Sequence, residues 1–184
     1  MGQKKTITVT LEVRELKHDI MNRSHLTGEV KEAEGKDYRA ASHMQASEDE
    51  GPDYQMLRSI SNAFSHIKTD LSEYLHEDST TSINRINKAV DESGKLQLTF
   101  MLPSNFDNSA CDSLGGMLHE YIVNRTLSEW YLITDKEEAQ GYAGMAVGAL
   151  EQAKQALYKR LRPTRPIHTD DQDNGTYRMQ RELL

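Results

Sequence analysis

The feature that most constrains the fold is a stripe of apolar residues that repeats every three or four positions between residues 53 and 78. This period matches one face of an α-helix, so the stripe predicts a long amphipathic helix packed on a core. Pro52 and Asp53 are typical of a helix start. The apolar positions are Met56, Leu57, Ile60, Phe64, Ile67, Leu71, Tyr74 and Leu75.

Two further long helices are expected in the second half of the chain. The first covers residues 107–133 and begins near Ser104 and Asp107, which are spaced like a capping box. Asp135 separates it from the second helix, over residues 136–162, whose burial face is largely alanine. Together with the central stripe, these patterns predict three main amphipathic helices.

Strands are expected at the N-terminus and before the second of these helices. Residues 6–13 alternate polar and apolar side chains, which is the period of a half-buried strand. Residues 95–102 alternate in the same way, and the turn DESG before them predicts a β-hairpin with residues 82–90. A short helix over residues 16–26 is expected to end at Gly28. The sequence therefore predicts an α+β fold with a small antiparallel sheet, made of the N-terminal strand and the hairpin.

Composition leaves a good part of the chain for surfaces and extended segments. Hydrophobic residues make up 36% of the chain and the mean hydropathy is -0.73, which is low for a compact domain of this length. Residues 29–52 are polar, and residues 163–184 follow a proline and carry no core pattern. We expect a single α+β domain over residues 1–162, with a long polar loop at about 29–52, and an extended C-terminal arm over residues 163–184.

No motif predicts catalysis, a metal site or a cofactor. His119 and Glu120 begin like a zinc-binding helix, but Val123 stands where the second histidine is required. Cys111 is the single cysteine, which excludes an intrachain disulfide and fits a reducing compartment. No apolar run approaches the ~18 residues of a membrane span, and no apolar signal segment begins the chain. We expect a soluble, unexported protein that is not an enzyme.

The last predicted helix has an unusually small-sided stretch, GYAGMAVGA, at residues 141–149. It does not fit a phosphate-binding loop, because no strand precedes it and no lysine-serine or lysine-threonine pair follows. Small residues allow close approach of another backbone, and the sequence leaves open whether that backbone belongs to the same domain or to a neighbouring subunit. The candidate subunit-packing face consists of Gly141, Gly144, Gly148 and Ala149.

A basic cluster ends the same helix, although the chain has a net charge of -7. Cations in the last turn stabilise a helix by about 0.3 to 1 kcal/mol each, which explains most of the cluster without a partner. The cluster is too narrow for sequence-specific nucleic-acid binding, so docking on an acidic subunit and lining a passage for DNA both stay open. The candidate basic contact patch consists of Lys154, Lys159, Arg160, Arg162 and Arg165.

Five segments together resemble small structural proteins of tailed phages of the crAss-like type. They are IMNRSHLTG at residues 20–28, LRSISNAFSHIKTDLSEYL at 57–75, LTFMLPSNFD at 98–107, HEYIVNRTLSEWYLIT at 119–134 and ALYKRLRPTRP at 156–166. The resemblance covers most of residues 5 to 166 and carries no residue-level motif. It implies a virion component, assembled in the bacterial cytoplasm as a ring of identical subunits in the neck or head-to-tail connector.

The expected function is therefore non-enzymatic virion assembly, as a subunit of a ring that links portal and tail. Residues 29–52 and 163–184 are candidates for arms that order on a neighbour, and packaged DNA is a possible non-specific contact. One alternative is a tail-completion or tail-tube protein of the same virion, which should contain more strand. Another is a nucleic-acid-binding accessory protein. A small enzyme has no set of residues to support it.

Overall fold

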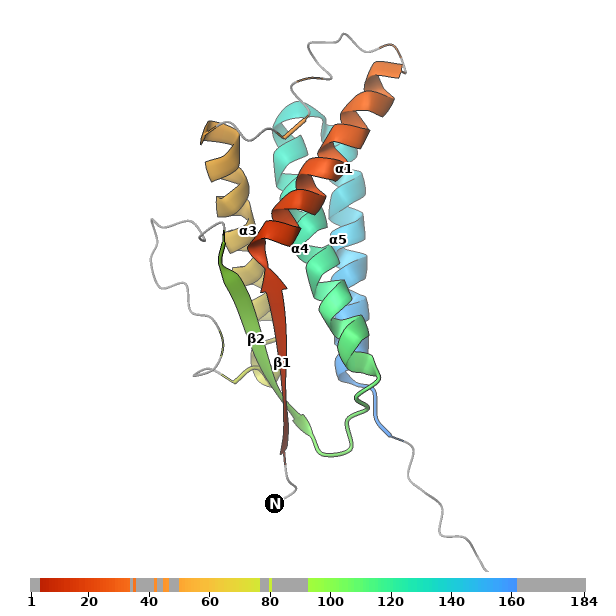
Figure 1. Cartoon of the computed structure of the whole chain (residues 1–184). Helices are drawn as coiled ribbons and strands as arrows, with labels where there is room; N and C mark the ends of the chain where they lie inside the picture. The colour runs from red at the N-terminus through yellow and green to blue at the C-terminus, as the bar shows by residue number, and fades with distance from the viewer. Residues whose placement is uncertain are drawn as a thin grey trace, which may run out of the picture.

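A computed structural model describes residues 4–33, 50–76 and 93–161, together with residues 35, 42, 45, 46 and 80. The elements are β1 (Lys4–Glu12), α1 (Val13–Ala33), α3 (Glu50–Asp70), the 3-10 turn η1 (Ser72–Tyr74), β2 (Lys95–Pro103), α4 (Ala110–Thr134) and α5 (Lys136–Leu157). Figure 1 shows α4 and α5 side by side, with α1 crossing them and the two strands continuing below α1. The predicted α+β class is confirmed, with four long helices and one small antiparallel sheet among the described residues.

The sheet consists of β1 and β2 in antiparallel register. Lys4 lies opposite Pro103, Thr8 opposite Thr99, and Glu12 opposite Lys95. The alternation seen in the sequence turns the apolar side chains of both strands toward the helices, because successive side chains of a strand point to opposite faces. The predicted hairpin partner, residues 82–90, lies outside the described residues.

The core fills the space between the sheet and the helices. The apolar stripe of α3 is buried from Met56 to Leu71, as its period predicts. Helix α3 ends at Asp70, however, so the prediction that it continues to residue 78 was wrong. The chain turns there because its backbone bonds to the sheet instead: Leu75 forms a bridge with Phe100, and His76 N donates to Thr99 O at 2.7 Å.

Helix α1 is longer than its pattern predicts. It runs from Val13 to Ala33, and Gly28 is buried inside it and does not end it. The glycine itself is packed inside the fold, and beyond it Lys31 Nζ lies 2.8 Å from the Glu138 carboxylate of α5, a contact that offsets the weak helix propensity of the glycine. The predicted polar loop was therefore wrong at both ends, because residues 29–33 belong to α1 and residues 50–52 belong to α3.

The start of α4 and the end of α5 differ from the predicted bounds. Helix α4 begins at Ala110, because the Asp107 carboxylate accepts hydrogen bonds from Ser109 N (3.0 Å) and Oγ (2.8 Å) in a turn before the helix. Helix α5 ends at Leu157, since the chain beyond it pairs with that same turn, with Leu161 N donating to Asn105 O at 2.8 Å. The expected junction is present: the Asp135 side chain accepts from Glu137 N at 3.0 Å and caps α5.

Candidate functional sites

The small residues of α5 lie on two different sides of the helix. Gly141, Gly144 and Gly148 are exposed, and a methyl group added to any of them would meet nothing within 4 Å beyond the local helix backbone. We call these three residues the glycine face. Ala149 is 7% exposed and lies in the core, so grouping it with the glycines was wrong. Of these four residues, only the three glycines have open space around them in the described part of the chain.

The opposite side of α5 is an alanine face that packs against α4. Its members are Ala139, Ala146, Ala149, Ala153 and Ala156. Their small side chains permit the close contact between the two helices. Beside the glycine face, by contrast, Met145 is 51% exposed and Val147 is 63% exposed. The sequence predicted a largely alanine burial face but did not separate Ala149 from the glycines, since both sides of the helix carry small residues.

The described members of the basic cluster bond mostly within the chain. Lys154 Nζ lies 3.3 Å from the Glu151 carboxylate. Arg160 donates to the carbonyl oxygens of Leu157 at 2.6 Å and Lys159 at 3.0 Å, and so satisfies carbonyls at the end of α5. Lys159 is exposed. Arg162 and Arg165 lie outside the described residues.

The fold adds two lysines from the other end of the chain to this cluster. Lys4 and Arg160 line one cavity of about 380 Å³, together with Glu73. Lys5 Nζ lies 3.5 Å from Phe106 O, and Phe106 forms a bridge with Arg160. The cluster is therefore broader than the sequence indicates, but the acid on the same cavity makes it mixed in charge.

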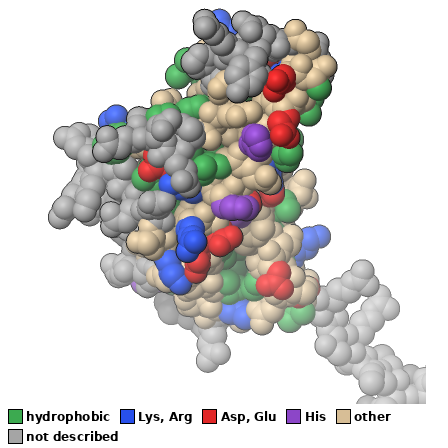
Figure 2. Space-filling view, turned by 45° about the horizontal axis from the view of Figure 1, so that its top comes forward, with side chains coloured by type: hydrophobic (Ala, Val, Ile, Leu, Met, Phe, Trp, Pro, Cys, Tyr) green, Lys and Arg blue, Asp and Glu red, His purple; other side chains and the backbone are tan. Residues whose placement is uncertain are grey.

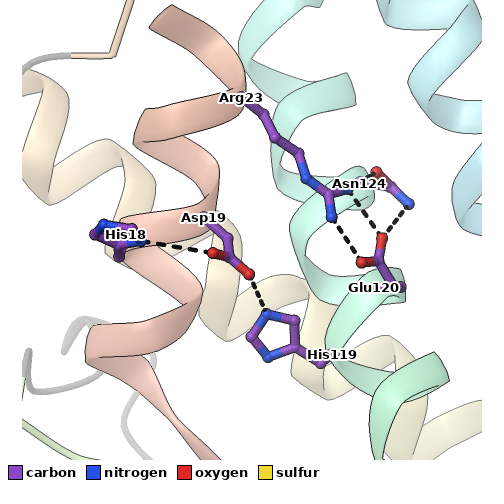
Figure 3. A network of polar contacts seen from close by, with 6 residues as sticks. All are labelled: His18, Asp19, Arg23, His119, Glu120 and Asn124. Carbon is purple, nitrogen blue, oxygen red and sulfur yellow. Dashed lines mark hydrogen bonds and ion pairs between the residues drawn. The ribbon is translucent and has the colours of Figure 1, made fainter. Parts of the chain in front are cut away.

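A polar network joins α1 to α4, and the sequence did not predict it. Figure 3 shows Asp19 and Arg23 of α1 directed at His119, Glu120 and Asn124 of α4. Asp19 accepts from His119 Nε2 at 2.8 Å. Arg23 makes two hydrogen bonds to the Glu120 carboxylate, at 2.6 and 2.9 Å, and a third to Asn124 Oδ1 at 3.0 Å.

The contacts in this network stabilise the charged forms of Asp19, Arg23 and Glu120. The hydrogen bond from Arg23 lowers the pKa of Glu120, and the same contact raises the pKa of Arg23. Burial alone raises the pKa of Asp19, but the contacts with His119 outweigh burial, so this pKa lies below its ordinary value. These groups hold one another, which is the arrangement of a structural clamp between helices.

The spacing of the network residues is visible in the sequence, but the packing of the helices is needed to show that these residues meet. Asp19 and Arg23 are four residues apart, as are Glu120 and Asn124, so each pair lies on one side of its helix. Only the contact between α1 and α4 shows that the two sides face each other. His119, the first residue of the incomplete zinc-binding pattern, pairs with Asp19 between the two helices.

A cavity of about 620 Å³ lies along α1. It is lined by Arg14, Lys17, His18, Met21, Asn22, His25, Gln45 and Ala46. Lys17 is already paired with Asp53 at 2.7 Å, and His18 lies 3.6 Å from Asp19. Figure 2 shows acidic, basic and histidine side chains interspersed over the described part of one face of the molecule.

Comparisons with protein-family models, with curated proteins and with solved structures found no match to this chain. The resemblance to phage connector proteins stays a prediction. Among the described residues, no helix is long and apolar enough to cross a membrane. The same residues contain no group of three or more His, Cys, Asp or Glu side chains suited to hold a metal ion.

Proposed function

We propose that this chain is a non-enzymatic structural subunit that assembles with copies of itself, and that the glycine face of α5 is one of its contact surfaces. The observation that carries the proposal is the open space around Gly141, Gly144 and Gly148. A glycine in an exposed helix interior costs about 1 kcal/mol relative to alanine, so the three together cost about 3 kcal/mol. No contact in the described chain offsets that cost, whereas the close approach of a second backbone would.

The position of α5 supports this use of the glycine face. Helix α5 packs mainly on α4, so its outer side stands at the edge of the helical layer. Exposed Met145 and Val147 flank the glycines and supply apolar area for a contact. A neighbouring helix could therefore reach the backbone of α5 at the glycines and bury these two side chains.

The setting that we propose is the one implied by the sequence resemblance. It is a ring in the neck or head-to-tail connector of a tailed-phage virion, with portal and tail proteins as further partners. A direct role in nucleic-acid binding receives less support, because Lys154 and Arg160 bond within the chain and Glu73 lies among the cations of the nearby cavity.

The test replaces the three glycines of the face by alanine and measures both association and stability. If another backbone packs there, the triple variant Gly141→Ala, Gly144→Ala, Gly148→Ala sediments as smaller species than the parent, yet melts at a higher temperature. The matched control is Gly116→Ala on α4, an exposed glycine that also has nothing within 4 Å. The control should raise the melting temperature without changing association. An assembly that survives the triple substitution unchanged would overturn the assignment of this face.

A further inference from the structure

Among the described residues, strand β1 has a strand partner on one edge only. It pairs with β2 along its whole length, from Lys4 to Glu12. On its other side, no backbone hydrogen bond connects it to any residue that the structure describes. Figure 1 shows β1 at the margin of the two-stranded sheet, with β2 on its other side. A row of backbone N–H and C=O groups on β1 is therefore available to another strand.

The composition of β1 favours such pairing. An unpaired strand edge is a template for a strand of another chain, and proteins commonly protect it with lysines, proline, β-bulges or very short length. The lysines of β1, Lys4 and Lys5, are confined to one end of the strand. Strand β1 has nine residues, none of which is proline or glycine, and five of them are β-branched. Its exposed side chains, Thr6, Thr8 and Thr10, are suited to cross-strand pairs.

We propose that the β1 edges of two copies of this chain pair antiparallel about Thr8, joining two sheets into one of four strands. The inference rests on the proposed self-assembly but uses a surface separate from the glycine face. Because neighbours within one ring are joined head to tail, this two-fold contact would join subunits of two facing rings. A two-fold axis at Thr8 places Lys4 opposite the partner's Glu12, and Glu12 opposite the partner's Lys4. The same residues serve on both copies, as a closed two-fold contact requires.

Charge selects this orientation over the parallel one. Lys4, Thr8 and Glu12 share the exposed face of the strand, because side chains alternate with a period of two. Antiparallel pairing sets opposite charges at both ends, whereas parallel in-register pairing would set each lysine against the partner's lysine. Glu12 already lies 2.9 Å from Lys95 on β2. The partner's Lys4 would extend this pair into a row of alternating charges across the strands.

Side-chain pattern and the end charges together select the register, because a slip of two residues keeps the faces matched but separates Lys4 from the partner's Glu12. With Thr8 at the axis, Thr6 meets the partner's Thr10 on the exposed face, and Ile7 meets the partner's Val9 on the core-facing side. A slip of one residue would place side chains of the exposed face opposite those of the core face. Such a slip is unfavourable in a sheet that has one buried face. No such penalty arises at the proposed register, because every residue meets one of its own face.

The first experiment exchanges the charges at the two ends of β1. Lys4→Glu alone and Glu12→Lys alone each place like charges opposite one another twice per dimer. Each is expected to raise the dimer dissociation constant about tenfold by sedimentation equilibrium. An equimolar mixture of the two variants restores opposite charges and should associate as tightly as the parent. A mixture no tighter than its components would overturn the pairing.

The second experiment reads the register by cross-linking in a Cys111→Ser background, with oxidised glutathione as the oxidant. Directly opposed strand residues have Cα atoms about 4.5–5.5 Å apart, which suits a disulfide. Thr8→Cys should therefore form a covalent dimer. Thr6→Cys should not, because the two copies of that residue would lie about 13 Å apart along the strands. A mixture of Thr6→Cys with Thr10→Cys should cross-link again.

The outcomes separate this inference from the proposed function. If Thr8→Cys does not cross-link and charge reversal has no effect, while the glycine-face triple variant loses association, the β1 pairing is wrong and the proposed assembly stands. If the parent sediments as a monomer up to about 1 mM, both are wrong. If Thr8→Cys cross-links and Thr6→Cys does not, the β1 pairing is supported whatever the glycine face does.

Discussion

Helices α4 and α5 are neighbours of similar length, with 25 and 22 residues, but they occupy different environments. Helix α4 contacts α1, α3, α5 and β1, whereas α5 contacts chiefly α4. Accordingly, α4 buries residues on several sides, including consecutive ones from Tyr121 to Asn124, while α5 buries one alanine-rich stripe. Helix α5 therefore keeps one side open along its length, whereas the exposed residues of α4 lie near its two ends, at residues 112, 113, 116 and 132–134.

The polar side chains of the two helices also lie in different environments. Helix α4 carries Glu120 and Asn124 into a network with α1, so these two polar side chains are bonded inside the molecule. On α5, Gln140, Glu151 and Gln152 remain exposed beside the glycine face. Substitutions on the two helices should therefore differ in size and in kind.

The largest effect is expected where α4 is fully enclosed. Leu118 is 0% exposed, and Leu118→Ala should lower the free energy of unfolding by about 2–5 kcal/mol, through lost burial and a cavity. Val147→Ala on the open side of α5 should change it by less than about 0.5 kcal/mol. Urea unfolding followed by circular dichroism measures both. Equal losses would contradict the contrast between the helices.

The next effect distinguishes the two sides of α5 itself. Ala153 is 0% exposed on the alanine face, so Ala153→Leu should overpack the contact with α4 and cost about 1–3 kcal/mol. Gly148→Leu faces open space and should not lower the stability of the monomer, since leucine is the better helix former. Thermal melts at dilute, monomeric concentration provide the comparison. A destabilised Gly148→Leu monomer would show that the glycine face is already occupied.

A smaller effect concerns a polar atom enclosed in α4. Thr126 is 2% exposed and its Oγ1 has no hydrogen-bond partner in the described structure. Thr126→Val removes this unpaired hydroxyl and should stabilise the fold by about 1 kcal/mol. Thr134→Val, at the exposed end of the same helix, is the control and should change stability little. A loss of stability in Thr126→Val would indicate that the hydroxyl is bonded.

The smallest effect is the pH dependence of the α1–α4 network. The folded-state pKa of Glu120 lies below its ordinary value of 4.5, and that of Asp19 below 3.8. Each carboxylate therefore contributes stability that is fully present above these ordinary values and is lost as pH falls through the lower folded pKa. Glu120→Gln should reduce stability at neutral pH by up to about 1 kcal/mol, because the pair is partly exposed.

The variant should also lose less stability than the parent on acidification from about pH 5 to pH 3. Chemical unfolding at a series of pH values measures the difference. Glu15→Gln serves as the control, since Glu15 is exposed and has no ion pair among the described residues. If the free energy of unfolding depends on pH in the same way for Glu120→Gln and the parent, the network does not stabilise the fold through the charge of Glu120.

The elements with a strong period could be predicted from the sequence. The alternation in β1 and β2 and the apolar stripe of α3 follow from backbone geometry, so local sequence was sufficient to place them. The end of α5 was missed because it depends on Asn105, far away along the chain. Helix α1 was predicted too short because the contact of its Lys31 with Glu138 of α5, beyond Gly28, cannot be seen in the residues of α1 alone.

The candidate sites divide in the same way. The sequence by itself determined that α5 is rich in small residues and that cations gather after it. Only the tertiary structure decided that the glycines face outward, that Asp19 meets His119, and that β1 has no strand partner on its second edge among the described residues. The physical reason is that a period depends on the geometry of one segment, whereas exposure and pairing depend on which segments pack beside it.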